Sequence, residues 1–207
     1  AHIKKINKVE DLSFDYTNIN KDILLGLKNE SFPLLDKTRQ KEMEDVILNV
    51  KNEKNSIGGI VECGIIGYPA GIGSPFFDSI ESRMSHILFS IPAVKGVEFG
   101  EGFAFADMLG SEANDEYYYD ENGNVKTFTN NNGGVLGGIS NGQPICFSVV
   151  IKPTASIARK QRTINVETKE NTSLEIVGRH DPVIVKRAVP VIEAASAICL
   201  YDFLLCD

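Results

Sequence analysis

The sequence contains no tryptophan, only three histidines and four cysteines, and no long basic run. The histidines are widely separated, and no cysteine pair has the spacing of a zinc or redox site. No Ser-His-Asp or Cys-His arrangement can be argued from spacing either. The sequence therefore predicts no metal site. A net charge of −7 without clustered Lys and Arg argues against a nucleic-acid-binding protein.

Transmembrane and targeting signals are also scarce. No apolar run is long enough to predict a bilayer span, and the first residues, AHIKKINKVED, resemble neither a signal peptide nor a transit peptide. These residues begin as if inside a strand, so we expect a piece of a longer chain. The cysteines lie in mostly apolar surroundings and are predicted to be core thiols of a cytoplasmic protein: Cys63, Cys146, Cys199 and Cys206.

The remaining composition, 43% hydrophobic and 24% charged, is that of a globular protein, and we expect one domain over residues 1–207. Apolar residues at helical spacing predict helices over 37–54, 79–91 and 183–205. Strands are predicted over 60–66, 93–103 and 145–151, with an exposed hairpin over 111–132 around Asn122-Gly123. This alternation of strands, helices and glycine turns predicts an α+β fold.

Two stretches could bind an anion. Five glycines between Gly133 and Gly142 could bring backbone N–H groups close to a ligand, although glycine pairs also serve tight turns and bulges. Lys152, Thr154 and Ser156 follow a predicted strand and could clamp a phosphate. The alternative for these three residues is a polar surface loop.

The stretch GRHDPVIVKRAVPVIEA, from Gly178 to Ala194, has two interpretations. Asp181 is a good N-cap residue and Pro182 is favoured at the first helical position, so the pair predicts a helix start. Arg179, His180 and Asp181 together could instead belong to a site, because Arg suits carboxylate and phosphate ligands. Both interpretations stay open on local pattern.

Five blocks in order resemble the C-terminal half and more of the chorismate synthase family: VECGIIGYPAGIGSPFFD, SIPAVKGVEFGEGF, NNNGGVLGGISNGQPI, IKPTASIARKQRTIN and GRHDPVIVKRAVPVIEA. The resemblance covers the chain from Ile57 onward and implies a layered β-α-α-β sandwich that is incomplete here. Family members are longer. The resemblance implies that an N-terminal segment with both family catalytic histidines is absent, so we expect the isolated chain to be inactive.

The family reaction is a 1,4-anti-elimination of phosphate from 5-enolpyruvylshikimate 3-phosphate, which gives chorismate in the shikimate pathway of aromatic amino acid biosynthesis. The resemblance thus implies a lyase that needs reduced FMN. It also implies a homotetramer and a small-molecule substrate, with no nucleic acid or membrane as partner.

Residues matching the family's flavin contacts can be named individually. They are Pro92, Ala93, Gly137, Lys152, Pro153, Thr154, Ala155, Ser156 and Arg179. Pro92 stands where many relatives have Asn, which leaves only a backbone contribution at that position. Asp181 resembles the acid proposed to manage a proton near the flavin, and it is the one catalytic residue that the resemblance implies here.

Two alternatives to an active lyase remain. A catalytically dead module could bind FMN or another anion through the glycine turns and the Lys152 loop while lacking acid–base partners. A structural interaction domain is the other, favoured by the −7 charge and by the exposed loop DEYYYDENGN.

Overall fold

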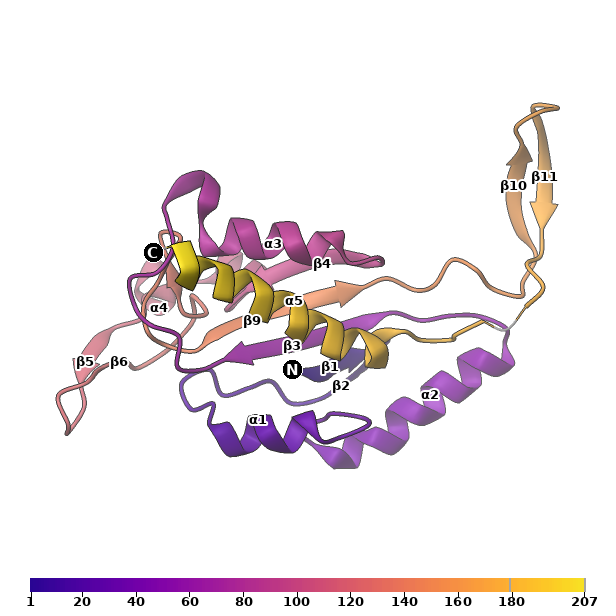
Figure 1. The fold of residues 1–207 in the computed structure, drawn as a ribbon. Helices are drawn as coiled ribbons and strands as arrows, with labels where there is room; N and C mark the ends of the chain where they lie inside the picture. Colours follow the sequence, from indigo (N-terminus) through magenta and orange to yellow (C-terminus); the bar gives the residue numbers. More distant parts are fainter. Residues whose placement is uncertain (179, 207) are drawn as a thin grey trace.

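A computed structural model describes residues 1–178 and 180–206 of the chain. The fold is α+β, built on a five-stranded antiparallel sheet with the order β2-β1-β3-β9-β4 (Figure 1). The strands are β1 (His2–Ile6), β2 (Val9–Glu10), β3 (Gly59–Ile65), β4 (Val94–Phe99) and β9 (Ile145–Ile151). The strand predicted over 145–151 is thus confirmed, and those predicted over 60–66 and 93–103 are confirmed with shifted or shorter bounds.

The two faces of this sheet differ in chemistry because side chains alternate along each strand. On one face, Val61, Phe147 and Val149 are fully buried in the main hydrophobic core. On the other face, Glu62 of β3 pairs in register with Ser148 of β9, and Ser148 pairs with Glu98 of β4. This second face therefore carries a row of polar residues across the middle of the sheet.

Two helices cover the apolar face, α3 (Ile80–Ser90) and α5 (Val185–Cys206). Ser79 caps α3 by accepting a hydrogen bond from the Ser82 N–H, as the sequence pattern favours. Three more helical segments lie near the N-terminal strands: α1 (Lys21–Lys28), η1 (Lys37–Arg39) and α2 (Gln40–Asn52). The helices predicted over 37–54 and 79–91 are confirmed with shorter bounds.

Short elements form the two ends of the molecule. One end holds η2 (Phe76–Asp78), η3 (Gly102–Asp107), α4 (Gly110–Ala113), β5 (Tyr117–Tyr119), β6 (Val125–Thr127), β7 (Val135–Leu136) and β8 (Ile139–Ser140). At the other end, the hairpin of β10 (Gln161–Asn165) and β11 (Glu170–Leu174) stands away from the body (Figure 1). The hairpin predicted around Asn122-Gly123 is confirmed as β5–β6.

Several sequence-based expectations were wrong. The C-terminal helix begins at Val185, and the Ile184 carbonyl accepts its first hydrogen bonds, so Asp181 does not cap it. That helix is also 22 residues long and apolar enough, by length and composition, to cross a membrane, contrary to the expectation that no run suffices. It packs on the sheet through Val185, Ile192 and other buried residues. Cys206 is exposed, unlike the other three cysteines.

Candidate functional site

The Pro92–Ala93 turn enters β4 in a strained conformation. Ala93 has φ +76°, in the left-handed region that glycine or asparagine usually occupies. Pro92 precedes it, and the Val94 N–H donates to the Ile91 carbonyl at 3.2 Å, as in a type II turn with proline at its second position. The Ala93 carbonyl accepts a hydrogen bond from the Lys152 N–H at 2.9 Å. Two segments of the predicted site therefore meet at one end of the sheet.

Residues 152–156 leave the end of β9 beside this turn. Lys152, Pro153, Ala155 and Ser156 are exposed, whereas Thr154 is half-buried. The Thr154 carbonyl accepts a hydrogen bond from the Ser56 hydroxyl at 2.6 Å. The Thr154 hydroxyl is buried and has no partner among the described residues. We call Pro92, Ala93 and residues 152–156 the strand-end cluster.

Asp181 reaches the same end of the sheet through its neighbour. The Pro182 carbonyl accepts a hydrogen bond from the Ile57 N–H at 2.8 Å, next to the Ser56 that holds Thr154. The Asp181 carboxylate is 47% exposed and pairs with the guanidinium of Arg187 in the first turn of α5. Asp181 thus lies near the strand-end cluster as an accessible carboxylate beside a cation.

Two neighbours of Asp181 complete this stretch of sequence. His180 is half-buried, and its Nε2 lies 2.9 Å from the Ile176 carbonyl. Arg179, the arginine expected to contact the flavin, lies outside the described residues.

Gly137 lies at the opposite end of the sheet. It forms the β7–β8 turn with Gly138, has φ +60°, and has open space where a Cβ would stand. With Pro75, Phe76, Ser79, Glu81 and Gly138 it lines a cavity of about 450 Å³. The glycines before it pack on the first residues of β9, whereas Lys152 follows the last, so β9 separates the two by roughly 20 Å. Within one chain, Gly137 is not brought together with the strand-end cluster.

A buried ionic network on the polar face of the sheet was missed in the sequence. Glu62 is fully buried and accepts hydrogen bonds from Lys4 Nζ at 2.7 Å, the Tyr16 hydroxyl at 2.9 Å and the Phe14 N–H at 2.7 Å. His2 Nε2 lies 2.8 Å from the same carboxylate, and His2 Nδ1 lies 3.1 Å from Asp11. An acidic residue in the middle of the apolar strand VECGI was the available signal.

The partners in this network set its charges. Burial alone raises the pKa of Glu62, but the hydrogen bonds from His2 and Lys4 outweigh it and lower that pKa to about 2. Burial likewise lowers the pKa of His2, but its bonds to Asp11 and Glu62 raise it above the ordinary value. Both shifts favour the charged pair, an ionised Glu62 beside a cationic His2. With its polar atoms paired, this network is suited to stability.

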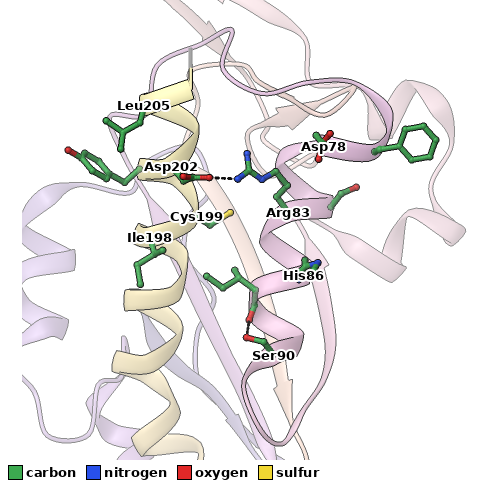
Figure 2. Close-up of a pocket in the computed structure, with 12 residues that line it drawn as sticks. Asp78, Arg83, His86, Ser90, Ile198, Cys199, Asp202 and Leu205 are labelled. Atoms are coloured by element: carbon green, nitrogen blue, oxygen red, sulfur yellow. Dashed lines mark hydrogen bonds and ion pairs between the residues drawn. The ribbon is translucent and has the colours of Figure 1, made fainter.

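A groove between α3 and α5 is the third candidate, with a volume of about 740 Å³. Figure 2 shows Arg83 of α3 reaching Asp202 of α5, with which it forms an ion pair. The Arg83 guanidinium also lies 4.4 Å from the centre of the Phe203 ring. His86 is exposed on the wall of this groove. Of the predicted flavin contacts that the structure describes, none lines it.

No group of three or more His, Cys, Asp or Glu side chains is placed to hold a metal ion within residues 1–178 and 180–206. The site residues that the structure does bring together are polar donors, one lysine and a carboxylate. The lysine and the hydroxyl donors of this set are suited to an anionic organic ligand.

Comparison with known proteins gives these residues a family. The model of the chorismate synthase family matches residues 1–205. The chain belongs to the chorismate synthase family. The chorismate synthase of Methanococcus aeolicus is 46% identical over 99% of this chain and 57% of its own length. That of Methanocaldococcus jannaschii is 50% identical over 85% of this chain and 47% of its own length.

The fold agrees with that membership. A solved structure titled "Crystal Structure of Chorismate Synthase" superposes with a TM-score of 0.78 at 29% identity, covering 99% of this chain and 55% of the other. The chain thus spans about half the length of the curated chorismate synthases that it matches. The chain therefore shares the fold and the family of these proteins.

Proposed function

We propose that this chain forms one wall of a chorismate synthase site, at which phosphate is eliminated from 5-enolpyruvylshikimate 3-phosphate to give chorismate. Membership of the family carries the proposal. The strand-end cluster supports it, because it gathers most of the family's flavin contacts at one end of the sheet. The cytoplasmic location expected for such a biosynthetic enzyme stays a prediction.

The residues of the strand-end cluster fit an anionic cofactor. The Thr154 hydroxyl is buried without a partner among the described residues, which leaves a donor available to a ligand. Lys152 is exposed beside it and forms no ion pair within the described part of the chain. Lys152, Thr154 and Ser156 would hold the flavin's anionic groups, and Pro92 and Ala93 would contact it through backbone. Reduced FMN, when bound, supplies electron density to the substrate ring as phosphate leaves.

Asp181 is the residue of this chain that we assign to proton management. Its carboxylate is 47% exposed and lies beside the Arg187 guanidinium, and a positioned carboxylate can take up a proton in general acid–base catalysis. The link from Pro182 to Ile57 fixes the backbone beside it. Asp181 would therefore receive or relay the proton lost from the substrate ring. Arg187 would act as a positioning residue for that carboxylate.

The separation of Gly137 from Lys152 has a consequence for how copies of the protein would form the flavin site. A flavin seated at Lys152 does not reach a glycine roughly 20 Å away along β9 of the same chain. If both contact flavin, they do so from different copies of the protein. This separation supports a homo-oligomer, consistent with the homotetramer that the family resemblance implies.

The groove in Figure 2 bears on the missing layers of the family fold. Ile198, Tyr201 and Leu205 of α5 are more than 60% exposed on a helix whose opposite side is already buried on the sheet. A helix with apolar side chains on opposite faces normally has both faces buried against other parts of the protein. We infer that the part of the family's length outside this chain packs here and completes the β-α-α-β sandwich.

Phosphate release tests the proposal. The chain is assayed under anaerobic conditions with reduced FMN and 5-enolpyruvylshikimate 3-phosphate, alone and with the N-terminal half of the Methanococcus aeolicus relative. We expect release only when both halves are present, because the family's two catalytic histidines lie in the N-terminal half. Flavin binding without release by the pair would favour the dead binding module. Failure of the pair to bind flavin would favour a structural interaction domain.

A further inference from the structure

The two ends of the molecule carry opposite charge. Between Lys95 and Lys126 the sequence has eight acidic residues and no Lys or Arg. Residues 152–166 hold four basic residues and no acidic one, whereas the turn and second strand of the hairpin, residues 167–174, hold Lys169 with Glu167 and Glu170. Because β4 and β9 are antiparallel, the segment that follows β4 and the segment that follows β9 leave the sheet at opposite ends (Figure 1).

The acidic end also exposes large apolar side chains. Phe103, Leu109, Tyr119 and Phe128 are between 65% and 86% exposed there. The acidic side chains beside them are exposed as well and form no ion pair within the described residues: Glu101, Asp107, Glu112, Glu116 and Glu121. Exposed aromatic residues surrounded by unpaired charge are typical of a surface that a partner covers. We call this region, residues 101–128, the acidic end.

The basic end is residues 159–166, which include β10 and which we call the basic arm; they lead into a hairpin that stands away from the body of the molecule (Figure 1). Every residue of β10 and β11 is exposed, and an isolated two-stranded hairpin is marginally stable in water. Arg159, Lys160 and Arg162 form no ion pair in the part of the chain that the structure describes. The nearest acid on the facing strand, Glu170, pairs in register with Asn165 and not with a cation. Ile164 is 62% exposed and adds apolar surface to the arm.

We propose that the acidic end of one copy of this chain receives the basic arm of a second copy. In an antiparallel pair related by a two-fold axis, each copy gives its arm and receives the other's, so the contact occurs twice and the assembly closes. The exposed aromatic side chains then cover Ile164, while Arg159, Lys160 and Arg162 meet the acidic side chains of the other copy. This interface rests on the homo-oligomer proposed above and names the surfaces that form it.

A second copy fits better than other partners. Nucleic acid or an anionic membrane would bind the arm but would be repelled by the acidic end, which would stay uncovered. A copy of the same chain supplies both complements at once. Charge complementarity across such an interface sets orientation and association rate, and salt weakens it.

Charge reversal tests the interface by sedimentation velocity at low ionic strength. One triple variant carries Asp107→Lys, Glu116→Lys and Glu121→Lys, and the other carries Arg159→Glu, Lys160→Glu and Arg162→Glu. We expect each alone to associate at least tenfold more weakly than wild type. An equimolar mixture should associate again, because every contact then joins opposite charges. Unchanged association of either variant alone, or no recovery on mixing, would overturn the proposal.

Cross-linking tests it independently of variant stability. A photoreactive amino acid replaces Tyr119, and isotopically heavy and light chains are mixed so that links between copies can be recognised. We expect links between copies to fall within residues 159–166, and none from the same probe at Lys41 on α2. Links between copies elsewhere, or only within one copy, would refute the interface. Neither experiment uses flavin or turnover, so its failure leaves the proposed lyase activity untouched.

Discussion

At the centre of the sheet, Glu62 is fully buried and every hydrogen bond to it comes from this chain. At the end of β9, the Thr154 hydroxyl is buried without such a partner, and Ala93 beside it holds a strained φ. Burial of polar groups is tolerable when they are paired and costly when they are not. The paired network therefore serves the fold, whereas the unpaired hydroxyl and strained backbone at the end of β9 fit the proposal that a ligand binds there.

The strongest way to break this comparison is to remove the carboxylate of Asp181. In the enzyme reconstituted with the N-terminal half, Asp181→Asn should lower kcat by at least about 100-fold, the scale of a lost acid–base group. The free energy of unfolding should change by less than about 1 kcal/mol, because the pair with Arg187 is exposed. Phosphate release and urea unfolding measure the two effects.

Arg187→Ala is the matched control, since it breaks the same ion pair but keeps the carboxylate. Its kcat should fall far less than that of Asp181→Asn. Equal losses in the two variants would assign the effect to the ion pair and not to proton transfer.

Glu62→Gln tests the buried ionic network at the centre of the sheet. It should destabilise the fold by about 3 kcal/mol, because Lys4 and His2 lose a buried anion. A pKa held at about 2 instead of 4.5 contributes stability on the order of 3 kcal/mol above pH 4.5. That contribution is lost as the pH falls from about 4.5 towards 2. Unfolding followed against pH should show this loss in wild type and not in the variant.

Glu10→Gln is the control for that experiment, because Glu10 pairs with Lys5 on the surface. Its effect should stay below about 1 kcal/mol. A variant at Glu62 no less stable than the Glu10 variant would contradict a stabilising role for the buried network.

Thr154→Val sharpens the comparison at the strand end. We expect the affinity for reduced FMN to fall about five- to tenfold, the value of one hydrogen bond, with no loss of stability. Thr129→Val should do the reverse, because the Thr129 hydroxyl donates to buried Asp115 at 2.7 Å. Anaerobic flavin titration and urea unfolding of both variants give the answer. Loss of stability in Thr154→Val would show that its hydroxyl serves the fold.

Ala93→Gly gives the smallest expected effect. Release of the strained φ, worth about 1 kcal/mol, is offset in part by the added freedom of glycine in the unfolded chain, so a gain of about 0.5 kcal/mol is expected. Ala158→Gly, at a position outside the left-handed region, should lose a similar amount. The midpoints of denaturant unfolding of the two variants measure these changes. An equal loss of stability in Ala93→Gly and Ala158→Gly would contradict strain at Ala93.

Much of the central sheet could be predicted because its strands are short apolar runs bounded by turn residues. The strand at 145–151 is the clearest case. The small helix α1 was missed because only Leu27 is buried on it, although Asn20 caps it and was a usable signal. No pattern marked β10 and β11, since every residue on them is exposed and neither face is apolar.

The site was predictable only where contacts are local. Residues 152–156 follow a strand and could be read as an anion loop, but their contacts with Ser56 and Ala93 join distant segments. Asp181 was expected to cap the helix, yet the Pro182 carbonyl is used by Ile57 and the helix starts at Val185. His2 and Glu62 are sixty residues apart, so no local spacing could pair them.

The most direct test of the central claim is an anaerobic titration of reduced FMN against wild type, Lys152→Met and the control Lys126→Met. Lys126 is exposed on β6, at the other end of the molecule. If the strand-end cluster holds the flavin's anionic groups, Lys152→Met should weaken binding at least tenfold and Lys126→Met should match wild type. Equal affinity of all three proteins would contradict the assignment of the strand-end cluster as the flavin wall.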